Sequence, residues 1–287
     1  MRAPIRPIRG RWPSWLEGLA PLRRFFRLDP LAILDDDASP EAFREAMSSI
    51  HVGGTIKITG GDRHPETDEL LIGAVDLSNA RIADIGASDG STSVDLIGRL
   101  PDFAAYVIAD LYLTLRAVRV GSRTALFDAQ DRCVLVVGRR LMAWPELSRV
   151  VRALYGRVIA RAAARLRSDG REVLLLNPET RRLIASDPRV SHRTHDVFTV
   201  WEGDRPDVIK IANLLRRLYF DDADLLRALH AVHASLPEGG HLMIVDNPRL
   251  ADPRPRAGVW RREDGRFVEV ARLGEPEIAD LVERVGA

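Results

Sequence analysis

The residues best placed to do chemistry lie in one short stretch, ADIGASDGSTS, at positions 83–93. Gly86 and Gly90 flank a turn between an apolar run and a predicted helix, and glycine lets a ligand approach the backbone closely. The N–H groups at a helix start attract an anion such as a phosphate or a carboxylate. Asp110 ends the next apolar run, where a carboxylate can accept hydrogen bonds from both hydroxyls of a ribose. Together these residues predict a site for a ligand that has a ribose and an anionic group.

The residues of this turn can be compared with the motifs of three protein families. Dinucleotide-binding folds have G-x-G-x-x-G, but Ser88 and Ser91 stand at the second and third glycine positions, so that match is poor. The stretch GASDG at 86–90 also fits the G-x-S-x-G turn of serine hydrolases, with Ser88 as the nucleophile. That chemistry needs an acid and then a histidine later in the chain, and the last histidine, His241, begins an apparent strand. The hydrolase hypothesis stays open at this point.

The third family is the class I S-adenosylmethionine-dependent methyltransferases, whose first motif the turn resembles: an acid, one residue, then a glycine-rich turn. Four later segments, VIADL, THDVF, DVIKIANLL and LPEGGHLMIVDN, resemble further motifs of that family in the same order. The resemblance covers most of residues 80–250. Through Asn213, Tyr219 and Phe220 the sequence is also similar, over a shorter stretch, to chemotaxis-receptor methyltransferases.

The methyltransferase resemblance implies roles for particular residues. Asp110 is implied as the ribose ligand, Asp196 as the contact to the adenine amine, and Val197 as the neighbour of the adenine ring. Ser88 stands where many members of the family have glycine. The implied cofactor-binding residues are Asp84, Gly86, Ala87, Ser88, Gly90, Asp110, Leu111, Asp196, Val197 and Asn213.

The resemblance implies S-adenosyl-L-methionine as the cofactor and methyl transfer to a small molecule or a peptide. Such a transfer is a one-step displacement, in which the protein mainly aligns the reacting atoms and excludes water. A general base is needed only when the acceptor is protonated, so we assign no catalytic residue. The candidate bases are His51, His64, Tyr219 and Asp246. A non-catalytic, methyltransferase-like binding protein is a further alternative.

Alternating apolar runs and helical patterns predict a doubly wound, mostly parallel α/β sheet of Rossmann-like type. A closing hairpin around Asp264-Gly265 predicts antiparallel strands at one edge. Ser39 and Pro40 predict the start of a helix that continues to about residue 50. Residues 51–80 are rich in glycine and turn-forming residues, which indicates a loop with one short strand around Thr55–Thr59.

We expect residues 1–50 to form an N-terminal helical extension, and 51–287 to form the methyltransferase-like domain. The stretch 111–172 departs from the family and reads as an inserted hairpin plus a long helix. With the glycine-rich residues 51–64, it would form the acceptor side. The apolar segment at 172–178 competes with VIADL for the second strand. Asp110 is retained as the ribose ligand because Asn177 suits a diol less well.

The composition and charge of the chain indicate which partners and which location to expect. The chain has 42 Lys and Arg against 41 Asp and Glu, and this net charge of +1 gives no reason to expect nucleic acid as a partner. Residues 1–27 hold seven Arg and one Glu, which we interpret as an arm packed across the main domain with its arginines in solvent. No apolar run is long enough to span a bilayer. Cys133 is the single cysteine, which excludes an intrachain disulfide and fits a cytoplasmic protein.

Two histidine pairs, at 192/195 and 230/233, lack the cysteine or carboxylate partners of a metal site, so no metal is expected. The oligomeric state is open.

Overall fold

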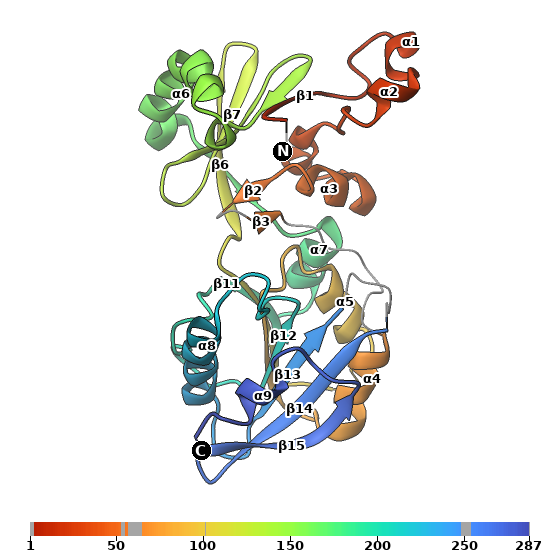
Figure 1. The fold of residues 1–287 in the computed structure, drawn as a ribbon, viewed down its shortest axis with the longest axis vertical. Coiled ribbons are helices and arrows are strands. Elements are labelled where there is room, and N and C mark those ends of the chain that lie inside the picture. Colours follow the sequence, from red (N-terminus) through yellow and green to blue (C-terminus); the bar gives the residue numbers. More distant parts are fainter. Residues whose placement is uncertain (1–2, 53–54, 57–64, 101, 248–253, 287) are drawn as a thin grey trace. The chain divides into compact units, whose positions relative to one another are not determined.

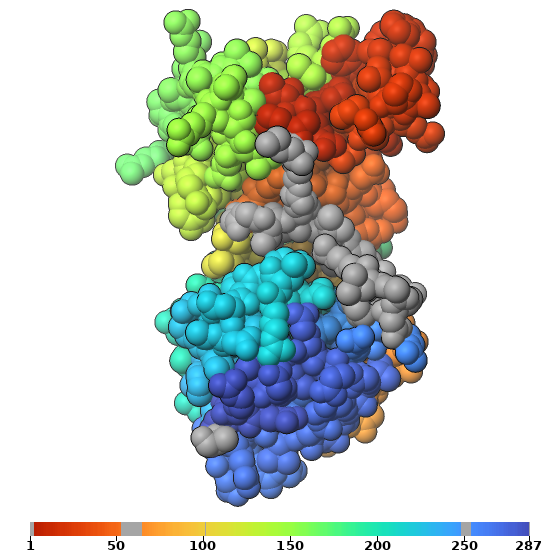
Figure 2. Space-filling view, viewed as in Figure 1, coloured from red at the N-terminus to blue at the C-terminus, as the bar shows by residue number. Residues whose placement is uncertain are grey.

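The computed structural model describes residues 3–52, 55–56, 65–100, 102–247 and 254–286. The chain forms two units, each built from two separate stretches. Unit 1 consists of Met1–Thr59 and Tyr112–Pro178, and unit 2 of Gly60–Leu111 and Glu179–Ala287. In Figures 1 and 2, the red N-terminal stretch and the green stretch belong to unit 1, whereas orange helix α4 and the cyan-to-blue C-terminal stretch belong to unit 2. The predicted extension and most of the predicted insertion therefore belong to the same unit.

Unit 2 contains the predicted doubly wound sheet. Its strand order is β11-β5-β4-β12-β13-β14-β15; the first five strands are parallel, and the closing hairpin adds two antiparallel strands. This confirms the mostly parallel sheet and its antiparallel edge. The strands are β4 (Arg81–Ile85), β5 (Ala105–Asp110), β11 (Val190–Thr194), β12 (Val208–Ala212), β13 (His241–Asp246), β14 (Arg256–Glu263) and β15 (Arg266–Leu273). The helices are α4 (Pro65–Ala74), α5 (Ser91–Ile97), α7 (Pro178–Ser186), α8 (Asp222–Ser235) and α9 (Ala279–Val282).

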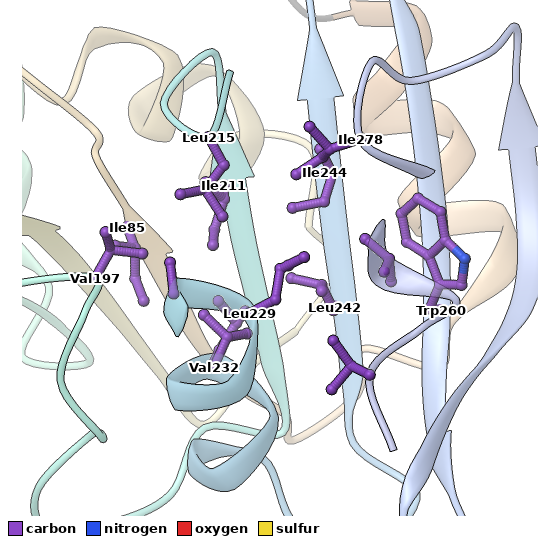
Figure 3. Packing of buried hydrophobic residues seen from close by; sticks show 14 of the residues in the cluster. Ile85, Val197, Ile211, Leu215, Leu229, Val232, Leu242, Ile244, Trp260 and Ile278 are labelled. Carbon is purple, nitrogen blue, oxygen red and sulfur yellow. The ribbon is translucent and has the colours of Figure 1, made fainter. Parts of the chain in front are cut away.

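The main core of unit 2 lies on one face of this sheet, under α8. Leu225, Leu229 and Val232 recur along that helix with the spacing of one face, and all three are buried. Figure 3 shows Leu229 and Val232 pointing at the strand residues Ile211 and Leu242. Asp221 begins the helix by accepting a hydrogen bond from the backbone N–H of Asp224.

The expectation of a loop over residues 51–80 is wrong in its second half, where the chain forms helix α4. Pro65 stands at the first helical position, and Glu66 and Asp68 lie in the first turn, where acids stabilise the positive end of the helix dipole. Leu71 is fully buried. Residues 53–54 and 57–64, which include His64, lie outside the described residues.

Unit 1 is built on an antiparallel sheet with strand order β1-β9-β8-β7-β6-β10. Helix α3 and the 3₁₀ helix η1 cover one face, and α6 packs on the other. The strands are β1 (Ile5–Pro7), β6 (Thr114–Val120), β7 (Arg123–Phe127), β8 (Cys133–Val137), β9 (Leu141–Ala143) and β10 (Arg171–Leu174), beside the two-stranded β2 (His51–Val52) and β3 (Thr55–Ile56). The helices are α1 (Ser14–Glu17), α2 (Ala20–Arg23), η1 (Pro30–Leu34), α3 (Pro40–Met47), η2 (Pro145–Leu147) and α6 (Arg149–Asp169).

The basic N-terminal arm packs into unit 1 as an edge strand, because β1 pairs with β9. Ile8 and Phe26 from the arm are buried. Ser39 begins α3 as expected, by accepting a hydrogen bond from the N–H of Ala42. Across the described residues, every helix is too short or too polar to cross a bilayer.

The competing apolar segment at 172–178 supplies β10, which pairs with β6 in the sheet of unit 1. The strand beside β4 in unit 2 is β5, which ends at Asp110. The choice of VIADL as the second strand of the doubly wound sheet is therefore confirmed.

Candidate functional site

The predicted cofactor residues gather at one edge of the parallel sheet. The glycine turn follows β4, Asp110 ends β5, Asp196 follows β11 and Asn213 follows β12. These are the carboxyl ends of four neighbouring strands. The strand order reverses beside β4, with β5 on one side and β12 on the other. In open α/β sheets, ligands bind at such a reversal, beyond the carboxyl ends of the strands.

The turn after β4 bends over the end of β5. Its backbone is left-handed at Gly86, Ser88 and Gly90, with φ values of 79°, 59° and 78°. The N–H of Gly86 donates to the carbonyl of Ala109 at 2.8 Å, and the N–H of Ser88 donates to Asp110 Oδ2 at 2.9 Å. The structure therefore brings together Ser88 and Asp110, which are 22 positions apart in the sequence.

The two glycines are packed against side chains of the protein itself. A Cβ at Gly86 would lie 2.8 Å from Leu214 Cδ2, and a Cβ at Gly90 would lie 2.6 Å from Thr180 Cγ2. Thr180 is fully buried and donates a hydrogen bond to the carbonyl of Asp89. The expectation that these positions are open for a ligand needs correction on this side of the turn, where Leu214 and Thr180 fill the space. Sequence reasoning missed both residues, because a glycine does not reveal which side chain packs on it.

Asp84 lies in the interior of unit 2. Its Oδ2 accepts hydrogen bonds from Ser93 Oγ at 2.8 Å and Tyr106 Oη at 2.9 Å, and the residue is 1% exposed. These contacts link β4, α5 and β5. Asp84 therefore fixes the helix that follows the turn, and its carboxylate is not presented to solvent as a ligand contact.

The remaining predicted cofactor residues differ in exposure. Asp196 Oδ1 accepts the N–H of Phe198 at 3.0 Å, while Val197 is buried in the main core. Leu111 is 41% exposed just after β5. Asn213 has a left-handed backbone, and its Oδ1 accepts the N–H of Asn247, the residue that follows β13.

The candidate bases are dispersed. Asp246 lies at the carboxyl edge, at the end of β13, and Tyr219 is exposed in the segment after β12. His51 belongs to unit 1. Burial raises the pKa of the Asp246 carboxyl above its ordinary value, although the hydrogen bond that its Oδ2 accepts from Glu277 N–H works in the opposite direction.

Buried polar atoms without a described partner mark the same edge. They are Ser88 Oγ in the turn, Ser91 Oγ at the first position of α5, and Asp246 Oδ1. Buried polar atoms in native proteins are nearly always hydrogen-bonded, to the protein itself, to water or to a ligand. These three unsatisfied oxygens, in the turn after β4, at the start of α5 and at the end of β13, are therefore the feature that best fits a polar ligand.

The described residues around Ser88 do not form the active site of a serine hydrolase. The positive φ of Ser88 resembles that of a strained nucleophile, but its Oγ has no hydrogen-bond partner among the described residues. His241 begins β13, at the opposite end of the strands from the turn. A Ser-His mechanism needs the two side chains within hydrogen-bond reach.

Buried His195 follows β11 beside the site, and its backbone N–H donates to the carbonyl of Asp110. Its ring lies 4.9 Å from that of Trp201, and burial lowers its pKa. Sequence reasoning considered it only as a metal ligand. Within the described ranges, no three His, Cys, Asp or Glu side chains gather as a metal site would require.

No protein-family model matches the sequence, and no curated protein does either. Solved structures that resemble the fold are distant. The mitomycin 7-O-methyltransferase MmcR is 20% identical, with 78% of this chain and 43% of that protein covered at a TM-score of 0.33. PigF, solved with SAH, is 14% identical, with 76% and 43% covered at a TM-score of 0.35. Phosphoethanolamine N-methyltransferase 1 of Haemonchus contortus is 11% identical, with 73% and 29% covered at a TM-score of 0.36. The chain thus spans less than half the length of these proteins.

Proposed function

We propose that unit 2 binds S-adenosyl-L-methionine at the carboxyl edge of its parallel sheet, and that the protein transfers the methyl group to a small molecule or a peptide. One observation carries the proposal: the Ser88 N–H donates to the Asp110 carboxylate at 2.9 Å, at the reversal of the strand order. This hydrogen bond sets an acidic strand end beside a glycine turn, as a ligand with a ribose and an anionic group requires.

The residues at the edge suit such a ligand in different ways. Asp110 would accept hydrogen bonds from the ribose hydroxyls, and Asp196 would accept one from the adenine amine. Ser88 Oγ and Ser91 Oγ, which lack described partners, would hydrogen-bond polar groups of the ligand. Asp84 would act as a positioning residue, because it holds Ser93 and Tyr106 rather than the ligand.

The bound cofactor supplies a methyl group that is already activated by a positively charged sulfur. The protein then has to hold the acceptor in line with it and exclude water. If the acceptor carries a proton at neutral pH, Asp246 is the best-placed base. Its raised pKa makes it a stronger proton acceptor than an ordinary aspartate, and its Oδ1 has no described partner.

Calorimetric titration with S-adenosylhomocysteine tests the cofactor assignment, with NADH as the control ligand. We expect S-adenosylhomocysteine alone to bind, and Asp110→Ala to weaken binding by about 1–3 kcal/mol, because hydrogen bonds to a charged group are lost. Asp187→Asn is a matched control, since Asp187 lies before the amino end of β11 and pairs with Arg189. An unchanged affinity in folded Asp110→Ala would contradict the ribose assignment, and binding of neither ligand would overturn the proposal.

Turnover separates an enzyme from a methyltransferase-like binding protein. Transfer of a labelled methyl group from S-adenosylmethionine to small molecules or peptides of a cell extract, lost in Asp110→Ala, is the result expected of the enzyme. Tight binding of S-adenosylhomocysteine with no labelled product would instead favour the non-catalytic alternative.

A further inference from the structure

Unit 1 contains a cavity of about 300 Å³ that the proposed function does not use. The basic arm, the end of α3 and the segments around β2 and β9 form its wall. Its lining residues are Ala3, Arg6, Arg9, Phe26, Arg27, Glu45, Ser48, Ser49, His51, Trp144 and Leu147. The lining contains three arginines and one acidic residue, so its formal charge is positive. Its volume lies at the lower end of the range for small-molecule sites.

Backbone pairing holds two of these arginines in place. The N–H of Arg27 donates to the carbonyl of Pro7 at 3.0 Å, and the N–H of Arg9 donates to the carbonyl of Arg27 at 2.7 Å. Neither guanidinium pairs with a carboxylate among the residues that the structure describes; Arg27 Nη1 contacts the backbone carbonyls of Arg24 and Phe26. A guanidinium on a fixed backbone and without an acidic partner can bind an oxyanion in a bidentate manner, through two parallel N–H···O hydrogen bonds.

The inner wall combines an aromatic stack with an unsatisfied hydroxyl. The rings of His51 and Trp144 stack at a centroid distance of 5.3 Å and an angle of 20°. Trp144 Nε1 donates to the carbonyl of Ser49 at 2.9 Å, which fixes the indole. Ser49 is 2% exposed, and its Oγ has no hydrogen-bond partner among the described atoms. Because buried hydroxyls are nearly always hydrogen-bonded, we expect Ser49 Oγ to bond to a group outside the described protein atoms.

We propose that this cavity is a binding site for a small organic molecule that carries an oxyanion, a phosphate monoester or a carboxylate. Arg9 and Arg27 neutralise the oxyanion, Ser49 Oγ donates to it or to a neighbouring polar group, and the stacked rings of His51 and Trp144 contact the organic body. The site depends only on residues of unit 1 and stands independently of the cofactor assignment in unit 2.

Calorimetry on the full chain with inorganic phosphate, phenyl phosphate and benzoate tests this site, in buffers of equal ionic strength. We expect phenyl phosphate or benzoate to bind saturably, and phenyl phosphate to bind more tightly than inorganic phosphate because the rings contact its organic body. Phenyl phosphate and benzoate also distinguish a phosphate ligand from a carboxylate ligand. Arg27→Gln is expected to weaken binding about tenfold or more, as the loss of a charged hydrogen bond implies.

Two variants separate this site from general attraction by positive charge. Arg139→Gln removes an arginine that lines a different cavity of unit 1, and it should leave the affinity unchanged. Ser49→Ala should weaken probe binding severalfold without lowering the thermal stability, because Ser49 Oγ makes no described hydrogen bond in the protein. The proposal is overturned if no probe binds saturably, or if Arg139→Gln weakens binding as much as Arg27→Gln does.

Discussion

Lys210 Nζ on β12 lies 2.8 Å from Asp68 Oδ1 on α4, with side-chain exposures of 0% and 1%. The sequence contains only two lysines among 42 basic residues, and this one is buried beneath the proposed cofactor edge. Asp84 is its register partner on β4, and the negative charge of Asp84 acts on the buried Asp68 carboxyl. The ion pair therefore joins helix α4 to the central strands that carry the glycine turn.

Removing the cation should destabilise unit 2 strongly. Lys210→Met leaves the Asp68 carboxylate buried without the cation that it pairs with, and we expect it to lower the unfolding free energy by about 3–5 kcal/mol. Urea denaturation followed by circular dichroism measures the loss. The double variant Lys210→Met/Asp68→Leu should recover part of it, because the uncompensated Asp68 charge is gone. A Lys210→Met protein as stable as the wild type would show that the pair does not hold α4 in place.

Tyr106 should make the protein less stable at high pH. Its hydroxyl is buried against the Asp84 carboxylate, and burial together with that negative charge raises the pKa of Tyr106 well above its ordinary value of 10. Above pH 10 the unfolded chain releases this proton while the folded chain keeps it. The unfolding free energy should therefore fall, with a slope from this group that approaches about 1.4 kcal/mol per pH unit.

The control for this slope is Tyr106→Phe. This variant should be less stable at pH 7, since a hydrogen bond to Asp84 is lost, but its disadvantage should shrink above pH 10. Phenolate absorbance provides a second check: the folded wild type and the folded variant should ionise equal numbers of phenols up to pH 11. One additional phenol ionising in the folded wild type would contradict the assignment.

The mostly parallel sheet of unit 2 was predictable because β4, β5, β12 and β13 are mainly apolar and buried, and β5 and β13 end in the acids Asp110 and Asp246. Strand β11 (VSHRT) is polar and largely exposed, so its own residues give a much weaker signal. Helix α4 was missed because the glycine-rich residues before it dominate the local composition, whereas its burial comes from contacts with the sheet. The pairing of Lys210 with Asp68 spans 142 positions and leaves no local signal in the sequence.

The organisation of unit 1 could not be predicted from the sequence for a different reason. Its two stretches are separated in the sequence by residues of unit 2, so the extension and the insertion read as independent additions. Strand β1 is only three residues long and contains a proline, which removes a backbone donor and suits it to the edge position where it pairs with β9. A short edge strand of this kind has too little periodicity to be recognised before its partner is known.

Gly90 should tolerate alanine less well than a glycine with the same backbone and open surroundings. Gly90 and Gly239 have φ values of 78° and 80°, but only a Cβ at Gly90 would meet another side chain, that of Thr180. Gly239→Ala should cost about 1–2 kcal/mol from the left-handed backbone alone. Gly90→Ala should cost about 1–3 kcal/mol more from overpacking. Denaturant titration compares the two variants, and equal losses would mean that Thr180 does not fill the space at the turn.

Cys133 should be unreactive while unit 1 is folded. The thiol lies on β8 under helix α6, and burial raises its pKa to about 12. A pKa of about 12 in place of the ordinary 9.0 lowers the thiolate fraction at pH 8 by roughly a thousandfold, and the thiolate is the reactive form. A disulfide reagent that releases a chromophore should therefore label the native protein very slowly and the urea-unfolded protein completely.

A variant in the α6 cover provides the control for this labelling. Leu166→Ala, which removes part of that cover, should lower the unfolding free energy by about 2–5 kcal/mol and speed the labelling of Cys133. Because Cys133 is the single cysteine, its labelling reports the opening of unit 1 alone, and rapid labelling in native buffer would contradict the burial of this thiol.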